Sequence, residues 1–215
     1  MLDARVRRAL APSLDAVAAR LAVAGVPPLA LTGAGWLAGV GACVSAGLGA
    51  WPAALVLWLA NRVFDGLDGP IARQHEATEL GGFLDIVADF SIYAGFVVGV
   101  AVDRPQARLA CVALLSAYYV SGTAFLALSS LLERRGPSVG DGRSLRFVGG
   151  LAEGTETVIV YILFCLFPGQ AELIAWLFTV AVAITAGQRV VLGVALLRQQ
   201  PSIESSTEQH REETR

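Results

Sequence analysis

Long apolar segments, separated by short polar or proline-containing breaks, dominate this sequence. Each segment is close to the roughly 20 residues that an α-helix needs to cross a bilayer. The segments lie at residues 29–49, 52–73, 80–102, 107–131, 147–167 and 171–197. This pattern predicts an all-α integral membrane protein with six transmembrane helices.

The residues before the first apolar segment have the pattern of a surface helix. Within residues 1–26, apolar residues recur at helical spacing and arginines lie among the polar positions. Such an amphipathic helix lies in the membrane interface, and Pro27 and Pro28 end it. At the other end, residues 201–215 are rich in Glu, Ser and Thr, which predicts a disordered tail. The predicted organisation is an interfacial helix at 1–26, a six-helix domain at 27–200 and this tail.

Composition supports a membrane protein and argues against other classes. Of the 215 residues, 55% are hydrophobic and 16% are charged, and the mean hydropathy is +0.61. A soluble domain carries about 25% charged residues. The net charge of −2 gives no indication of a nucleic-acid partner. The two histidines and three cysteines lack the arrangement of a zinc site or a catalytic triad, so the cysteines are expected to be small core residues.

The arginines indicate how the predicted helices cross the membrane, because basic residues concentrate on the cytoplasmic side. With the N-terminus inside, the outside loops hold only Arg104 and Arg108. The inside segments hold Arg5, Arg7, Arg8, Arg20, Arg73, Arg134, Arg135, Arg143, Arg146, Arg198, Arg211 and Arg215. Both termini are therefore expected to be cytoplasmic.

Four carboxylates interrupt the second and third apolar segments. Asp65 and Asp68 are three residues apart and Asp85 and Asp89 are four apart, so each pair shares one helical face. A short turn joins the two segments, so the helices are antiparallel neighbours and the carboxylates converge near the cytoplasmic end. Oxygen ligands of this kind suit Mg²⁺ or Mn²⁺. The alternative is structural pairing with Arg62 and Arg73, but two arginines cannot neutralise four carboxylates.

The residues around these carboxylates form a longer pattern that resembles a known signature. The run is Asp65-Gly-Leu-Asp68-Gly69-Pro-Ile-Ala72-Arg73, seven further residues, and then Gly81-Gly-Phe-Leu-Asp85-Ile-Val-Ala-Asp89. It resembles the signature of the CDP-alcohol phosphatidyltransferase family, which has two Asp, Gly, Ala-Arg, a gap of seven or eight residues, and then Gly, Asp and Asp. All eight fixed positions are present, and the six-segment layout also fits that family.

The resemblance implies a role for each matching position. Asp89 would be the catalytic base that takes a proton from the acceptor hydroxyl. Small side chains would let the CDP moiety lie against the helices, although close helix packing is an alternative for the glycines. Arg73 would contact phosphate or anchor the helix at the cytoplasmic surface. One or two Mg²⁺ or Mn²⁺ ions would be held by Asp65, Asp68, Asp85 and Asp89, and the CDP moiety by Gly69, Ala72, Arg73 and Gly81.

The implied reaction belongs to phospholipid biosynthesis in the bacterial inner membrane, with the active site on the cytoplasmic side and a homodimer as the assembly. A substituted phosphate would pass from a CDP-linked lipid, with CDP-diacylglycerol the expected donor, to an alcohol, and CMP would be released. The alternatives are transfer from a soluble CDP-alcohol to diacylglycerol, a divalent-cation transporter and a non-catalytic scaffold. Arg143 and Arg146 are candidates for binding an anionic acceptor or for anchoring. Glu153 and Glu156 begin the fifth segment, and Glu156 would face the acceptor or cap a helix.

Overall fold

The computed structural model describes residues 15, 16, 20, 27–72, 78–134 and 154–198, and its described part is helical throughout, without strands. The helices are α2 (Pro28–Gly47), α3 (Trp51–Ala72), α4 (Glu79–Asp103), η1 (Pro105–Ala107), α5 (Arg108–Arg134), α6 (Gly154–Leu166), η2 (Pro168–Gln170) and α7 (Ala171–Arg198). Of these, η1 and η2 are short 3₁₀ helices that precede α5 and α7. The all-α prediction is confirmed.

Local sequence explains where these helices begin and end. Pro27 precedes α2 and Pro28 occupies its first turn, where no backbone N–H is needed. Gly49 adopts a positive φ of 71° in the turn between α2 and α3, a conformation that glycine tolerates without steric cost. Thr78 caps α4, because its hydroxyl accepts a hydrogen bond from the Gly81 N–H at 3.1 Å.

Among the described residues, four stretches are long and apolar enough to cross a membrane: α2, α4, η1 with α5, and η2 with α7. Helix α3 has 22 residues but carries Arg62, Asp65 and Asp68, and the described part of α6 has 13 residues. The integral membrane class is therefore supported by four helices, and the count of six spans stays a prediction. The predicted interfacial helix at 1–26 and the tail at 201–215 lie outside the described residues, apart from Asp15, Ala16 and Arg20, which are helical.

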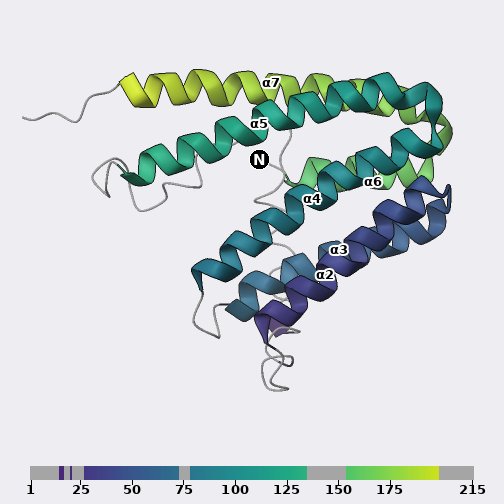
Figure 1. The fold of residues 1–215 in the computed structure, drawn as a ribbon, viewed down its shortest axis with the longest axis horizontal. Coiled ribbons are helices and arrows are strands. Elements are labelled where there is room, and N and C mark those ends of the chain that lie inside the picture. The colour runs from purple at the N-terminus through teal and green to yellow at the C-terminus, as the bar shows by residue number, and fades with distance from the viewer. Residues whose placement is uncertain (1–14, 17–19, 21–26, 73–77, 135–153, 199–215) are drawn as a thin grey trace, which may run out of the picture.

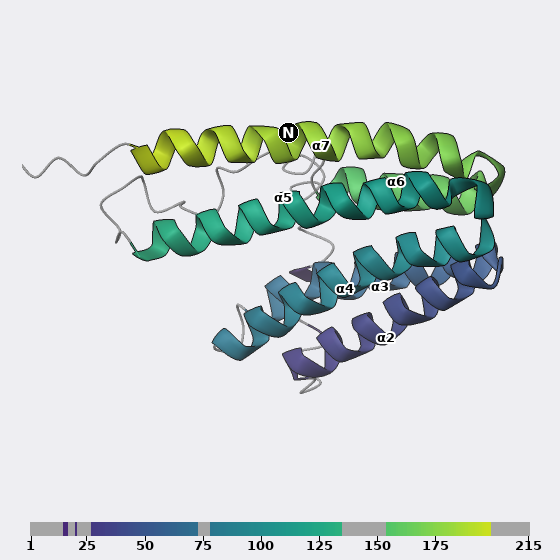
Figure 2. The same cartoon turned by 45° about the horizontal axis from the view of Figure 1, so that its top comes forward.

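The helices form two groups that α6 joins. Helix α2 packs along both α3 and α4, α5 packs along α7, and α6 lies against α3 (Figure 1). The connections from α2 to α3, from α4 to α5 and from α6 to α7 all lie at one end of the bundle in both views (Figures 1 and 2). The end of α3 and the start of α4, which carry the predicted signature, therefore lie together at the opposite end.

An aromatic cluster fixes α3, α4 and α6 relative to one another. The ring of Tyr161 lies 4.8 Å from that of Trp58 and 4.6 Å from that of Phe96, and all three side chains are fully buried. Aromatic pairs of this kind contribute about 0.5–1.5 kcal/mol beyond their buried area. The Tyr161 hydroxyl also donates a hydrogen bond to the backbone oxygen of Tyr93 at 2.7 Å. Because Tyr93 also contacts Asp89 and Trp58 contacts Arg62, this cluster positions the candidate site.

Helices α2 and α4 approach each other closely where glycine is present. A Cβ atom built on Gly99 would lie 2.5 Å from the backbone oxygen of Cys43, and one built on Gly39 would lie 2.7 Å from the side chain of Ile92. Small residues permit such backbone approach in membrane helices. Cys111 and Cys165 are buried and Cys43 is partly buried, all as free thiols, which agrees with the structural role predicted for them.

Candidate active site

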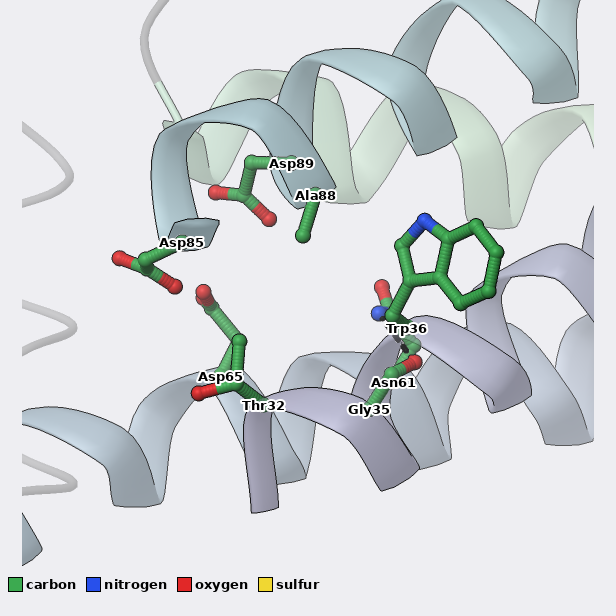
Figure 3. A pocket seen from close by; sticks show the side chains of 8 residues that line it. All are labelled: Thr32, Gly35, Trp36, Asn61, Asp65, Asp85, Ala88 and Asp89. Carbon is green, nitrogen blue, oxygen red and sulfur yellow. Dashed lines mark hydrogen bonds between the residues drawn. The ribbon is translucent and has the colours of Figure 1, made fainter. Parts of the chain in front are cut away.

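Three of the four predicted carboxylates line one small hollow at the signature end of the bundle. Asp65 comes from α3, and Asp85 and Asp89 come from α4. In Figure 3 their carboxylates point toward a shared space. The hollow has a volume of about 10 Å³ and is lined by Thr32, Gly35, Trp36, Asn61, Asp65, Asp85, Ala88 and Asp89. The common face predicted for Asp85 and Asp89 agrees with their position around one hollow, whereas α3 and α4, predicted to be direct neighbours, each pack mainly against α2.

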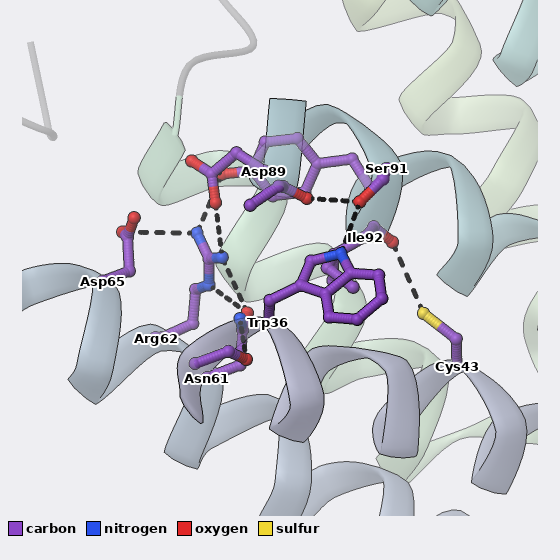
Figure 4. A network of polar contacts seen from close by, with 11 residues as sticks. Trp36, Cys43, Asn61, Arg62, Asp65, Asp89, Ser91 and Ile92 are labelled. Atoms are coloured by element: carbon purple, nitrogen blue, oxygen red, sulfur yellow. Dashed lines mark hydrogen bonds and ion pairs between the residues drawn. The ribbon is translucent and has the colours of Figure 1, made fainter. Parts of the chain in front are cut away.

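A buried arginine joins the two helices inside this site. The Arg62 side chain is 10% exposed, and its Nη2 atom lies 2.8 Å from Oδ1 of Asp89. Its Nη1 atom lies 3.4 Å from Oδ2 of Asp65 and donates to the Tyr93 hydroxyl at 2.9 Å. The side-chain oxygen of Asn61 accepts from Nε and Nη2 of the same guanidinium, at 2.9 and 2.6 Å (Figure 4). All three guanidinium nitrogens therefore contact oxygens of α3 or α4.

Two aromatic rings also lie close to the same guanidinium. The Arg62 Cζ atom lies 4.7 Å from the centroid of Trp58 and 5.2 Å from that of Tyr93, within the range of a cation–π interaction. Asn61 is held in turn, because its Nδ2 donates to the Gly35 backbone oxygen of α2 at 2.8 Å. The ion pairs considered as an alternative at the sequence level thus exist for Asp65 and Asp89. Sequence reasoning missed the involvement of Asn61 and Tyr93, and the only available signal was their polarity within apolar segments.

The donor atoms around the hollow have the chemistry that Mg²⁺ or Mn²⁺ prefers. They are carboxylate, amide and hydroxyl oxygens, and hard divalent ions favour oxygen ligands. Within the described part of the chain, however, no three acidic, histidine or cysteine side chains come close enough together to hold one ion. The side chain of Asp68, the fourth predicted ligand, lies outside that part. The donor set fits the predicted ion, and the convergence of the four carboxylates on it stays a prediction.

Three of the residues predicted to hold the CDP moiety belong to the helix ends beside this hollow. Gly81 is in the first turn of α4, beside the capping hydroxyl of Thr78. Gly69 and Ala72 belong to the last turn of α3, and Arg73 lies outside the described residues. Glu156 is in the first turn of α6, where an acidic residue favours the helix N-terminus. Arg143, Arg146 and Glu153 lie outside the described residues.

A second, larger cavity adjoins the site on the side of α5, α6 and α7. Its volume is about 470 Å³, and Phe90 and Tyr93 of α4 form part of its wall. Arg189 of α7 lies in the same wall and points into the bundle, because its Nη1 donates to the Ser121 hydroxyl at 2.8 Å and its Cζ lies 5.2 Å from the Phe125 ring. A substrate in this cavity would reach the carboxylate network through Tyr93.

Together, the long apolar helices and the aspartates around one hollow are the arrangement expected of an integral membrane protein that carries this signature. The chain belongs to the CDP-alcohol phosphatidyltransferase family, whose sequence model matches residues 26–187. Membership in this family makes the protein a transferase.

Two further comparisons show which known proteins this chain is similar to. It is 39% identical over 202 residues to the Inner membrane protein YnjF of Escherichia coli (strain K12), a match that covers 92% of this chain and 98% of that protein. Its fold is similar to that of Mycobacterium tuberculosis phosphatidylinositol phosphate synthase (PgsA1), which was solved with CDP-DAG bound. That similarity has a TM-score of 0.65 at 23% identity and covers 84% of this chain and 92% of that chain.

Proposed function

We propose that this protein transfers a substituted phosphate from CDP-diacylglycerol to an alcohol and releases CMP. The observation that carries the proposal is the placement of Asp65, Asp85 and Asp89 around one hollow in a chain that matches the family over residues 26–187. CDP-diacylglycerol is the donor we favour, because the structurally similar synthase was solved with that molecule bound.

In the proposed reaction, the acceptor hydroxyl attacks the lipid-side phosphorus of the diphosphate. The new phosphorus–oxygen bond forms as the bond to the CMP phosphate breaks, and CMP leaves with that electron pair. Asp89 takes the proton from the attacking hydroxyl, as a positioned carboxylate can do. Divalent ions held by Asp65, Asp68, Asp85 and Asp89 would supply charge neutralisation for the diphosphate and the departing CMP.

The remaining signature residues have proposed roles in binding the donor. Gly69, Ala72 and Gly81 would leave room for the nucleotide between the ends of α3 and α4, and Arg73 would contact its phosphates. The adjoining cavity would provide space for the second substrate or for lipid chains. We further propose a homodimer in the inner membrane, the location named for the Escherichia coli relative.

The decisive experiment is a direct assay of CMP release by the purified protein. CDP-diacylglycerol is supplied with Mg²⁺ or Mn²⁺ and a panel of alcohols, including serine, inositol, inositol phosphate and glycerol 3-phosphate. We expect release that depends on both the ion and one class of alcohol. Failure with every alcohol, together with activity from a soluble CDP-alcohol and diacylglycerol, would reverse the roles of donor and acceptor. Failure of both assays would contradict transferase function, and metal-dependent ion flux would then favour the transporter.

The proposed orientation gives a separate prediction. A reporter fused after Arg215 should be cytoplasmic, and one inserted at Asp103 to Pro105 should be external, because basic residues are retained inside. Paired reporters active on opposite sides of the membrane are the readout. If both reporters lay on the same side, six spans with cytoplasmic termini would be wrong.

A further inference from the structure

Arg62 lies outside the eight signature positions, which begin at Asp65. Its side chain nevertheless contacts several residues of the candidate site. Its five N–H groups contact oxygens of Asn61, Asp65, Tyr93 and Asp89. A guanidinium is planar and presents its donors in a fixed fork. When the fork is filled from several directions, neither the arginine nor its partners can rotate independently.

The two carboxylate oxygens of Asp89 have different hydrogen-bond partners. Oδ1 accepts from Nη2 of Arg62 at 2.8 Å. Oδ2 lies 3.4 Å from the Tyr93 hydroxyl, a longer and weaker contact. The Tyr93 oxygen already accepts from Nη1 of Arg62, so the tyrosine proton is directed toward Oδ2. The Asp89 side chain is 28% exposed, so it is accessible from the site.

The guanidinium is itself held rigidly. Its Cζ atom lies 4.7 Å from the centroid of Trp58 and 5.2 Å from that of Tyr93, and both rings belong to the aromatic cluster that joins α3, α4 and α6. Asn61, which accepts from the guanidinium, also donates a hydrogen bond to the Gly35 carbonyl of α2. The position of Asp89 on α4 is therefore coupled to three other helices through one side chain.

We infer that Arg62 is a positioning residue that fixes the orientation of Asp89, occupying Oδ1 and leaving Oδ2 as the oxygen that accepts the proton of the acceptor hydroxyl. This inference rests on the proposed function. Orientation matters because a displacement of about 1 Å in a reacting group can lower a rate by about 10²-fold. This role differs from nucleotide binding, because the guanidinium contacts the proposed base Asp89 and the neighbouring Tyr93 and Asn61.

The test is a set of substitutions at Arg62 with two separate measurements. Arg62→Met keeps the length of the side chain but removes the donors, and should lower the turnover of CMP release by about 10²-fold. Binding of CDP-diacylglycerol, measured without acceptor, should change by less than about threefold, because the nucleotide contacts remain. Arg62→Lys keeps the charge but cannot fill the fork, so its turnover should lie between those of Arg62→Met and the natural protein.

A double-mutant cycle with Asp89→Asn tests whether Arg62 affects turnover through Asp89. Two residues that act as a unit give non-additive changes. In the Asp89→Asn background, Arg62→Met should therefore lower turnover by less than about threefold. This double variant also lacks the Asp89 charge, the closer of the two carboxylates that Arg62 balances, so it remains informative if Arg62→Met alone does not accumulate in the membrane.

Arg104→Met is the matched control. Arg104 also pairs with an aspartate, Asp103 at 2.9 Å, and lies over a tryptophan, Trp51 at 5.6 Å, but at the opposite end of α4. It should leave turnover unchanged. Full activity in Arg62→Lys, additive effects in the cycle, or loss of donor binding in Arg62→Met would each overturn the inference. If the natural protein neither binds CDP-diacylglycerol nor releases CMP, the proposed function fails instead.

Discussion

Replacing Asp89 with asparagine should lower the turnover of CMP release by about 10²–10⁴-fold, the usual contribution of a general base. Asparagine has nearly the same shape as aspartate. Its amide oxygen can still accept from Nη2 of Arg62, and its amide nitrogen can face the Tyr93 hydroxyl, which now lies 3.4 Å from Oδ2. The site would keep its geometry, but the amide cannot take a proton from the attacking hydroxyl.

The measurement compares CMP release with affinity for CDP-diacylglycerol and for Mn²⁺ in the same purified sample. Both affinities should be largely retained. Asp103→Asn is the matched control, since it is the same substitution at the far end of the same helix, where Asp103 pairs with Arg104. Near-normal turnover in Asp89→Asn would remove Asp89 as the base. Loss of donor and metal binding together would make it chiefly a ligand.

Substituting alanine for Gly99 should destabilise the fold more than the same change at the other glycines of the described helices. The new Cβ would meet the Cys43 backbone oxygen at 2.5 Å and Gly47 N at 3.2 Å. Backbone atoms cannot rotate away, so α2 and α4 would have to separate. Overpacking of this kind typically costs about 1–3 kcal/mol. We expect a corresponding loss of free energy of unfolding in detergent.

Gly187→Ala is the control for that experiment. Gly187 lies within α7, and a Cβ there has no neighbour within 4 Å among the described residues. The substitution gains about 0.8–1.0 kcal/mol of helix propensity, so it should be neutral or stabilising. Equal unfolding free energies for the Gly99 and Gly187 variants would show that α2 and α4 can separate without cost.

The membrane class, the helix positions and the common face of Asp85 and Asp89 follow from the sequence alone. The expected segment at 80–102 became α4 at Glu79–Asp103, and the one at 171–197 became α7 at Ala171–Arg198. Such boundaries are predictable because an apolar segment prefers lipid whatever packs against it. Proline, glycine and charged residues then mark where each apolar segment ends. The spacing of Asp85 and Asp89 likewise fixes their common face, whatever packs against it.

Only the tertiary structure decided which surfaces of these helices face one another. In α7, buried Phe178 and Val182 and exposed Leu177 and Val191 are equally apolar, because lipid and protein interior select the same side chains. Hydropathy therefore does not distinguish residues that face the interior of the bundle from residues that face lipid. The pairing of Arg62 with Asp89, 27 residues away, and its contact with the ring of Tyr93 depend on how α3 and α4 are rotated about their axes. That rotation is set by packing between distant segments.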